Sequence, residues 1–384
     1  MKIVIAPQAF KGSISALDAA TAMREGIKRV VPEAQVVTVP VADGGDGTLE
    51  TLVEGSGGRI HDLEVTGPLG ERRMAQWGAM GDGITAVIEM ARTSGLALVP
   101  LDERNPLAAT TYGLGEAIAH ALDAGFRRFI VGIGGSATND AGAGMAQALG
   151  VRLLDDAGDD LPFGGAPLAR LRNIDTSGMD ARIAQCEFMV ACDVNNPLTG
   201  PTGASAIYGP QKGATPEMIA ELDAALSHFA AVVERDIGAT INDVAGSGAA
   251  GGLGGGMIAF AGGELRAGVD IVLGTIRLDD YLPGCDLVIT GEGSMDHSTI
   301  YNKAPVGVAQ RAKRLGIPVV GVSGSLGAGF QDVHEHGIDA LTSITPGPMS
   351  LDEASTRAAE LIANATEQAL RFMKAGSAVF GEHS

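Results

Sequence analysis

Near the start of the chain, strand and helix signals follow one another in the order strand, helix, strand, and this order constrains the fold more than any other feature. The run "KIVIA" is short, apolar and rich in β-branched residues, and residues 15–31 then carry apolar side chains at helical spacing behind Ser15, a candidate N-cap. A second apolar run, "AQVVTVPV", leads into the glycine-rich acidic loop "ADGGDG". This order predicts a parallel sheet whose loops gather at the carboxyl edge of the strands.

The same order returns toward the C-terminus. Residues 286–290 and "IPVVGVSG" predict strands around a helix at about 304–315, and residues 351–373 predict a final helix. The middle of the chain differs, because from about His61 polar and apolar residues alternate around turn signals such as "GPLG", which is typical of hairpins. Further on, an amphipathic helix is expected to begin at Pro216, behind the cap Thr215.

These patterns predict an α/β protein of two domains, which also suits a length of 384 residues. One parallel-sheet α/β domain would combine both ends of the chain, residues 1–60 and 281–384. A second, mixed α/β domain, residues 61–280, would be inserted into it. An active site in the cleft between the two domains would then collect loops from distant parts of the sequence.

The composition excludes several classes of function. The formal charge is −19, with 46 acidic against 27 basic residues, and an acidic protein repels nucleic acid and anionic lipid. The three cysteines form no CxxC pair and no HExxH occurs, so neither a zinc site nor a disulfide framework is expected. The first apolar run is too short for a signal peptide, and no stretch approaches the roughly 20 apolar residues of a membrane span. We therefore expect a cytoplasmic protein with small-molecule partners, either a monomer or a homodimer.

Two glycine-rich stretches have some features of phosphate-binding loops. Residues 246–251 fit GxGxxG, but the strand that should precede a dinucleotide site is weak, so a flexible or close-packed glycine loop is favoured. In "FIVGIGGSATNDAGAGMAQAL" a strand leads through Ser136, Thr138 and Asn139 into a helix, where N–H groups and hydroxyls could hold an anion. The alternative is a tight turn with Asp140 as N-cap. Neither a P-loop nor the G-x-S-x-G of α/β-hydrolases occurs.

Acidic residues follow two of the expected strands. Asp43 and Asp46 lie in "VADGGDGT", and Glu292 and Asp296 lie in "ITGEGSMD", so both loops should reach the carboxyl edge of the sheet. Carboxylates in such loops can hold Mg²⁺; the alternative is that they are ordinary acidic turn residues. Lys11 follows the first strand, where it could meet phosphate oxygens or be a solvated surface lysine.

The stretch "CDVNNPLTGPTGASAIYGPQKGA", residues 192–214, is unusual for a surface loop. Among many glycines, prolines and threonines it holds one carboxylate, two amides and a lysine, namely Asp193, Asn195, Asn196 and Lys212. This combination is typical of a site that handles phosphate and a small polar molecule.

Taken together, these segments resemble the type I bacterial glycerate kinase family over nearly the whole chain. The matching motifs are "KIVIAPQAFKGSISA", "PVADGGDGT", "ERNPLAATTYGLGEAI", "GIGGSATNDAGAGMAQALG", "ACDVNNPLTGPTGASAIYGPQKGA", "GAAGGLGGG", "VITGEGSMD" and "NKAPVGVA". The resemblance implies transfer of the γ-phosphoryl group of ATP to D-glycerate, commonly at the 2-hydroxyl, with Mg²⁺, in glyoxylate and sugar-acid catabolism. It also implies two α/β domains, one of them flavodoxin-like and discontinuous, with the second inserted.

Phosphoryl transfer depends on positioning and charge neutralisation more than on covalent chemistry, and the candidate roles follow from that. We expect Asp193 to orient or deprotonate the acceptor hydroxyl, and Lys11 to stabilise charge on the transferred group. Mg²⁺ would be carried by Asp296 together with Glu292, or with Asp43 and Asp46. The other candidates would bind substrate or phosphate: Ser136, Thr138, Asn139, Asn195, Asn196, Lys212 and Lys303.

The chain departs from the family pattern at several positions near these candidates. The family usually has D-S-F-K where this chain has residues 8–11, which begin with Gln8. Ser294, Ser298 and Asn302 replace a cation, an amide and a glycine, and Ala141 replaces a common glycine. Two alternatives therefore stay open: a kinase of this family that acts on the 3-hydroxyl or on another small hydroxy or sugar acid, and a non-catalytic sugar-acid binding protein.

Overall fold

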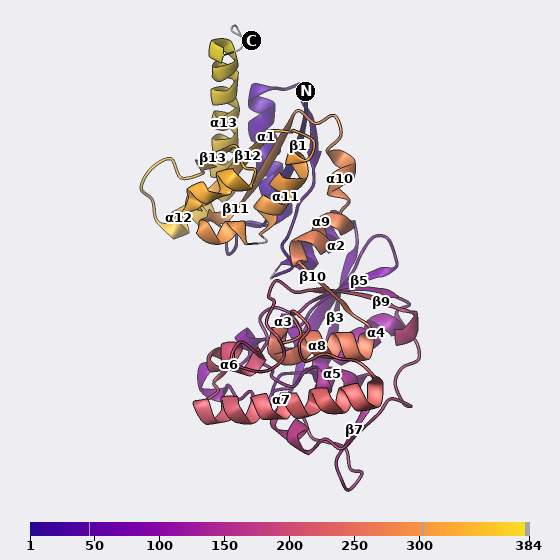
Figure 1. Cartoon of the computed structure of the whole chain (residues 1–384). Coiled ribbons are helices and arrows are strands. Elements are labelled where there is room, and N and C mark those ends of the chain that lie inside the picture. The colour runs from indigo at the N-terminus through magenta and orange to yellow at the C-terminus, as the bar shows by residue number, and fades with distance from the viewer. Residues whose placement is uncertain (46, 302, 381–384) are drawn as a thin grey trace. The chain divides into compact units, whose positions relative to one another are not determined.

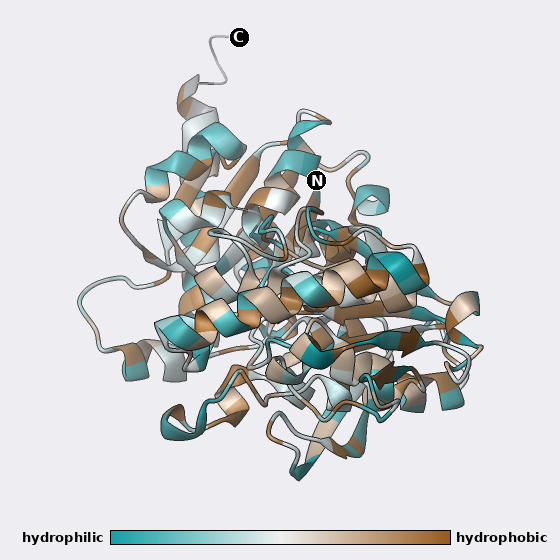
Figure 2. Cartoon of the chain, turned by 60° about the horizontal axis from the view of Figure 1, so that its bottom comes forward, coloured by the Kyte–Doolittle hydropathy of each residue, from teal (hydrophilic) through white to brown (hydrophobic). Residues whose placement is uncertain are grey.

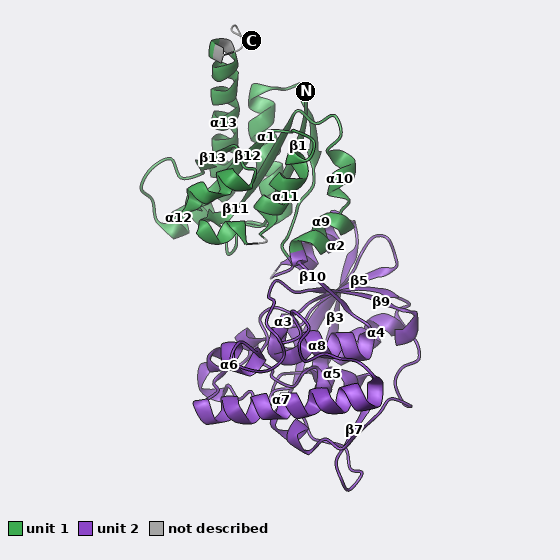
Figure 3. Ribbon diagram, in the orientation of Figure 1, with its two compact units in different colours: residues 1–43, 269–384 green, residues 44–268 purple. Residues whose placement is uncertain are grey.

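The computed structural model describes residues 1–45, 47–301 and 303–380 (Figure 1). The chain forms two compact units (Figure 3): unit 1 combines residues 1–43 and 269–384, and unit 2 comprises residues 44–268. Within the described ranges, no helix is both long and apolar enough to cross a membrane.

Unit 1 is built on a five-stranded sheet whose neighbouring strands all run parallel, in the order β13-β12-β11-β1-β2. The strands are β1 (Lys2–Pro7), β2 (Gln35–Thr38), β11 (Leu287–Met295), β12 (Val319–Leu326) and β13 (Ala340–Ser343). Counted along the chain, this is the order 2-1-3-4-5 of flavodoxin-like sheets. The expected discontinuous, flavodoxin-like α/β fold is therefore confirmed.

The helices of unit 1 cover this sheet with apolar side chains. The Ser15 hydroxyl caps α1 by accepting a hydrogen bond from the backbone N–H of Asp18 at 3.1 Å, as the sequence predicts. Met23 of α1 and Leu361 of α13 join Ile5 of β1 in one buried core. The helices are α1 (Ala16–Val30), α9 (Gly268–Thr275), α10 (Leu278–Tyr281), α11 (Ala304–Lys313), α12 (Leu351–Thr356) and α13 (Ala358–Phe380).

The C-terminal segment differs from the single helix that the sequence predicts over residues 351–373. The structure has two helices there, α12 and α13, because Arg357 leaves helical geometry with φ −102° and ψ 15°. The break allows α13 to begin with Ala358 buried against the core, whereas most of α12 is exposed.

Unit 2 is built on a six-stranded mixed sheet in the order β10-β9-β6-β5-β4-β3. Its strands are β3 (Arg59–Thr66), β4 (Arg72–Ala79), β5 (Thr85–Glu89), β6 (Arg128–Gly132), β9 (Glu187–Ala191) and β10 (Glu264–Arg266). The first three pair antiparallel, which confirms the predicted hairpins, and the other neighbours pair parallel. A separate two-stranded ribbon joins β7 (Arg152–Leu154) to β8 (Asn173–Asp175).

Helices complete unit 2, and most of them are amphipathic, whereas α8 is apolar and buried along nearly its whole length. Figure 2 shows hydrophobic and hydrophilic residues alternating along helices of the chain. The longest helix of the unit, α7, begins at Pro216 behind the cap Thr215, as predicted, and buries Leu222, Leu226 and Phe229. The helices are α2 (Thr48–Gly55), α3 (Ala91–Ser94), α4 (Tyr112–Asp123), α5 (Ala143–Ala148), α6 (Ala204–Tyr208), α7 (Pro216–Ile237) and α8 (Ala249–Ala261).

The chain passes from unit 1 to unit 2 between Asp43 and Gly44, and back to unit 1 between Gly268 and Val269. The boundaries expected from the sequence lie after residues 60 and 280. The helix α2 belongs to unit 2, because the backbone N–H of Leu49 donates to Glu89 Oε1 of β5 at 3.0 Å. The helix α9 packs in unit 1, where Val269 lies directly over Gly307 of α11. Local sequence pattern predicts these helices, but it does not say which core they join.

Candidate functional site

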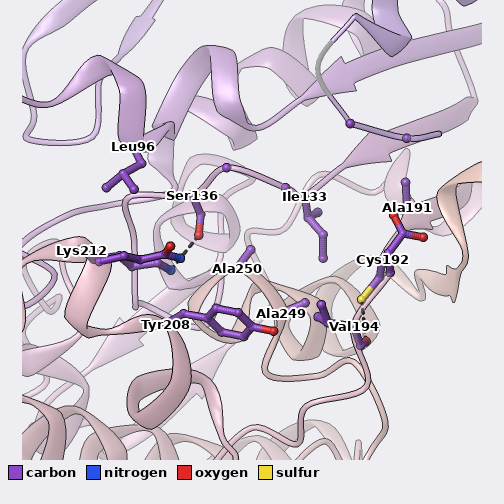
Figure 4. A pocket seen from close by; sticks show the side chains of 16 residues that line it. Leu96, Ile133, Ser136, Ala191, Cys192, Val194, Tyr208, Lys212, Ala249 and Ala250 are labelled. Carbon is purple, nitrogen blue, oxygen red and sulfur yellow. Dashed lines mark hydrogen bonds between the residues drawn. The ribbon is translucent and has the colours of Figure 1, made fainter. Parts of the chain in front are cut away.

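A cavity of about 370 Å³ lies in unit 2, where the loops that follow β6 and β9 come together (Figure 4). Parallel neighbours place their carboxyl ends at one edge of a sheet, and ligands commonly bind there. The loop after β6 contributes Ser136, the loop after β9 contributes Asp193, and the segment around α6 contributes Tyr208 and Lys212. Three of the predicted site residues, Ser136, Asp193 and Lys212, therefore line one cavity.

Lys212 is the most unusual residue of this cavity, because its side chain is only 1% exposed. Its amine donates hydrogen bonds to Ser136 Oγ at 2.7 Å and to the carbonyl oxygen of Thr138 at 2.6 Å (Figure 4 draws the bond to Ser136). Burial lowers the pKa of Lys212 to about 7, although the nearby Asp140 carboxylate acts in the opposite direction. Near neutral pH the amine is therefore balanced between its charged and neutral forms, and an anion in the cavity would favour the charged one.

Asp193 supplies the carboxylate of the cavity. It follows β9, its side chain is exposed, and its Oδ1 accepts a hydrogen bond from the backbone N–H of Gly268 at 2.9 Å. Its neighbour Cys192 also lines the cavity, but burial raises the pKa of the Cys192 thiol, which stays protonated at neutral pH. The carboxylate of Asp193 is thus the basic group that this part of the cavity offers to a hydroxyl.

Thr138 and Asn139 do not line the cavity, although the sequence places them beside Ser136. Both are completely buried, and Asn139 Nδ2 donates to Ser205 Oγ at 3.0 Å. Thr138 contributes through its backbone carbonyl, which accepts the hydrogen bond from Lys212. Their proposed contact with substrate through side chains remains a prediction.

The Asp140 carboxylate accepts hydrogen bonds from backbone N–H groups at the N-terminal end of α5. This carboxylate is buried, and its donors are the backbone N–H groups of Gly142 and Gly144, each at 3.2 Å, and the N–H and hydroxyl of Thr111. Burial raises the pKa of Asp140, and these four donors oppose that rise. The N-cap residue of α5 is Gly142 and not Asp140, but the Asp140 carboxylate takes up N–H groups at this helix end that an external anion would otherwise need.

The two asparagines after Asp193 are placed differently from each other. Asn196 is engaged on both sides of its amide, since Nδ2 donates to the carbonyl oxygen of Thr202 at 2.7 Å and Oδ1 accepts from the Tyr208 hydroxyl at 2.6 Å. Asn195 is exposed and is not part of the cavity lining. Asn196 therefore positions Tyr208, a lining residue that sequence reasoning missed although it lies in the same polar stretch.

The glycine-rich stretch 246–256 packs closely against neighbouring backbone. This agrees with the sequence-based expectation of a close-packed glycine loop. A Cβ on Gly251 would lie 2.0 Å from the carbonyl oxygen of Thr138, and a Cβ on Gly256 would lie 2.2 Å from that of Ala141. Ala250 has a positive φ of 55° beside these glycines and lines the cavity. The glycines thus bring α8 against the backbone that carries Ser136.

The candidates of unit 1 gather at the carboxyl end of β11. Glu292 is 7% exposed, its Oε1 accepts from Thr299 Oγ1 at 2.9 Å, and its Oε2 lies 4.0 Å from Lys303 Nζ. Burial raises the pKa of Glu292 to about 7 against the effect of Lys303, and Asp43 and Asp296 add to the rise. These side chains are therefore close enough to influence one another electrostatically.

Asp296 caps a short 3₁₀ helix, because its Oδ1 accepts from the backbone N–H of Ser298 at 2.7 Å and from the Ser298 hydroxyl at 2.5 Å. The Ser298 hydroxyl lowers the pKa of Asp296 and keeps it ionised. Lys11 follows β1 and is exposed. Asp46 and Asn302 lie outside the described residues.

The acidic side chains of unit 1 are the candidate ligands for Mg²⁺. Among the described residues, no group of three or more His, Cys, Asp or Glu is close enough to hold a metal ion. Mg²⁺ bound with a nucleotide commonly takes one or two carboxylates, and waters and phosphate oxygens complete its shell. Asp43, Glu292 and Asp296, which interact electrostatically, fit that requirement in chemistry.

Comparison with known proteins gives a consistent result along the chain. The sequence profile described as the glycerate kinase family matches residues 3–374. A glycerate kinase from Bacillus subtilis (strain 168) is 51% identical over 380 residues, which cover 99% of this chain and 100% of that protein. A glycerate 2-kinase from Escherichia coli (strain K12) is 50% identical over 366 residues, covering 95% of this chain and 96% of that protein.

A solved structure agrees with the fold. The crystal structure described as glycerate kinase 2 from Salmonella typhimurium LT2 matches with a TM-score of 0.91 and 50% sequence identity, covering 98% of this chain and 99% of that one. The similarity therefore extends through both units.

Proposed function

This chain belongs to the glycerate kinase family, and from that premise we propose that it transfers the γ-phosphoryl group of ATP to the 2-hydroxyl of D-glycerate, giving 2-phospho-D-glycerate. The observation that carries the proposal is that Asp193, Lys212 and Ser136 line the same cavity. A carboxylate and a buried amine in the same cavity match an acceptor that has both a hydroxyl and a negative charge.

Asp193 acts on the acceptor hydroxyl. The N–H of Gly268 orients the carboxylate, which can accept the proton of the hydroxyl as it attacks the γ-phosphorus. Because phosphoryl transfer needs little covalent assistance, orientation of this hydroxyl is the main contribution of the carboxylate.

Lys212 and Ser136 hold the carboxylate of glycerate. A charged amine that is excluded from water interacts with an anion more strongly than a solvated one, since the surrounding dielectric screens it less. The Ser136 hydroxyl already accepts a hydrogen bond from Lys212, so its own proton is available for the substrate. This arrangement binds an anion in a protein whose formal charge is −19.

We assign the strand ends of unit 1 to the phosphates of ATP. Lys11 and Lys303 would neutralise phosphate oxygens, and one or two of the carboxylates of Asp43, Glu292 and Asp296 would hold Mg²⁺. When bound, Mg²⁺ would neutralise charge on the β- and γ-phosphate oxygens. The Ser298 hydroxyl keeps Asp296 ionised, and Glu292, whose pKa burial raises to about 7, would lose its proton as a cation binds.

The test is ³¹P NMR of the product formed from D-glycerate, MgATP and the purified protein. We expect the signal of 2-phosphoglycerate. A 3-phosphoglycerate signal would keep the family but contradict the position of transfer, and absence of ATP turnover with D-glycerate would contradict the proposed acceptor.

One structural observation favours a second candidate, transfer to the 3-hydroxyl or to another small hydroxy acid. Gln8 stands where the family usually has an acid, and its Oε1 is buried with no hydrogen-bond partner among the described residues. A buried carbonyl oxygen without a partner is costly, and Gln8 begins the segment 8–11 in which this chain departs from the family pattern. Turnover with a longer sugar acid, together with none with D-glycerate, would select this candidate.

A further inference from the structure

Unit 1 contains a further cavity, of about 270 Å³, and Lys11 is the one residue of its lining that the assignments above use. It lies at the carboxyl end of the flavodoxin-like sheet and is lined from four strands: Lys11 follows β1, Gly293 lies on β11, Ser325 lies on β12 and Ile344 follows β13. Residues around α12 close its remaining side. Open parallel sheets of this kind bind their ligands outside the carboxyl ends of the strands.

Two glycines of the lining lie where backbone segments approach one another at this end of the sheet. A Cβ on Gly324 would lie 2.3 Å from the carbonyl oxygen of Gly293, so neighbouring strands approach each other here without side chains between them. A Cβ on Gly293 would meet Phe10 Cα at 3.5 Å, an ordinary contact distance. Gly293 and Gly324 therefore contribute backbone, and no side chain, to the lining of the cavity.

The walls are apolar and the rim carries hydroxyls. Phe10 and Ile344 are buried members of the core beneath the sheet, and Met349 and Ala354 pack against it. Ser13 and Ser325 add hydroxyls, and Ser325 Oγ donates to Ser294 Oγ at 3.0 Å. Among the described lining residues, Lys11 alone carries a formal charge. Such walls suit a neutral aromatic ring, whereas glycerate, a small anion, is better matched by Lys212 and Ser136.

We propose that this cavity binds the purine base of the nucleotide, with its ribose at the hydroxyl rim and its phosphates toward Lys11. This inference rests on the proposed function, because it names where the phosphoryl donor of that reaction binds. The cavity volume lies just below the roughly 300–1,000 Å³ of sites that enclose whole ligands, which suits a base held with its phosphates outside.

The first test is photo-cross-linking of the full-length protein with 8-azido-ATP, followed by mass spectrometry of the labelled peptides. We expect labels on residues 10–13 or 344–355 that excess ATP prevents. ATP-protected labels found only within residues 44–268, or labels that ATP does not prevent, would overturn the assignment. The readout does not depend on turnover, so an inactive protein that is still labelled in unit 1 would reject the proposed function and not this inference.

The second test fills the cavity with Ala354→Trp, and Ala359→Trp, at an exposed position of α13 outside the lining, is the matched control. We expect KM for ATP to rise about tenfold in Ala354→Trp, equivalent to about 1.4 kcal/mol, with KM for D-glycerate nearly unchanged. Equal KM values for ATP in the two folded variants would contradict the proposal. If Ala354→Trp does not fold, Gly293→Ala replaces it, since its added methyl group makes only ordinary contacts.

Discussion

Two buried ionisable residues give the stability of this protein opposite pH dependences. The pKa of Lys212 falls from its ordinary 10.5 to about 7, so between these values the unfolded chain binds more protons and stability rises with pH. The pKa of Glu292 rises from 4.5 to about 7, so between these values the folded chain binds more protons and stability falls as pH rises. The effect of Glu292 on stability falls below about pH 7 and that of Lys212 above it, so the two can be measured separately.

Lys212→Met should remove the effect above pH 7. We expect the free energy of unfolding of the variant, relative to the wild type, to decrease as pH rises from about 7 toward 10, by at most about 1.4 kcal/mol per pH unit. Urea unfolding at several pH values measures this difference. Lys374→Met, at an exposed position, is the control, and a difference for Lys212→Met that stays constant with pH would refute the expected titration.

Asp193→Asn should keep the cavity and lose the base. We expect kcat to fall about 10²- to 10⁴-fold, the usual contribution of a positioned general base, with little change in the free energy of unfolding. Asp102→Asn removes an exposed carboxylate elsewhere in unit 2 and should leave kcat unchanged. Near-normal turnover by Asp193→Asn would show that another group handles the hydroxyl proton.

At the scale of elements, the glycine-rich part of α8 depends on close backbone contact. Gly251 has φ +70° and no space for a Cβ against the carbonyl oxygen of Thr138, whereas Gly238, with φ +80°, has no atom within 4 Å of its ideal Cβ. We expect Gly251→Ala to lower the free energy of unfolding by about 3 kcal/mol, from strain and overpacking together. Gly238→Ala introduces the backbone strain of a positive φ without overpacking, and it should lower the free energy of unfolding by about 1 kcal/mol. Equal losses in thermal unfolding would mean that the packing around Gly251 adds nothing.

Local elements were the most predictable part of the structure. The caps Ser15 and Thr215 and the hairpins after residue 59 are encoded by neighbouring residues, so the sequence alone predicts them. The break at Arg357 has no glycine or proline to announce it. The direction of a side chain after a strand is likewise a tertiary property, which is why Ser136 reaches the cavity while Thr138, two residues later, is buried.

Lys212 illustrates the same limit within the site. The sequence shows a lysine among turn residues and predicts that it balances anionic charge. Its burial, its bonds to Ser136 and the backbone of Thr138, and its lowered pKa come from segments more than 70 residues away in the chain. The family motifs identified the reaction class, but the cavity had to be seen to separate lining residues from supporting ones.

At the scale of the whole molecule, the chain enters and leaves unit 2 at adjacent points. A Cβ on Gly44 would lie 2.6 Å from Gly268 Cα, so the ends of residues 44–268 meet. Domains whose ends are close tolerate excision. We expect the fragment 44–268 to fold alone and to unfold cooperatively, as measured by circular dichroism and thermal denaturation.

The fragment 61–280, cut at the boundaries that the sequence suggests, is the matched comparison. It lacks α2, whose Leu49 and Leu52 are completely buried, and it should be markedly less stable or insoluble. Similar melting temperatures for both fragments would show that α2 is dispensable to this core.

The insertion also sets an order of events on the ribosome. β1 is an inner strand that pairs with both β2 and β11, yet the whole of residues 44–268 must be synthesised before β11 begins. At about 5–20 residues per second, this delay lasts on the order of 10 s or longer. During that time unit 2, whose chain is continuous, can complete its sheet, while the first strands emerge early and wait with one edge unpaired. The inserted unit can therefore fold before the unit that surrounds it in the sequence, and the edge of β1 that later pairs with β11 is open to mispairing until residues 287–295 have been made.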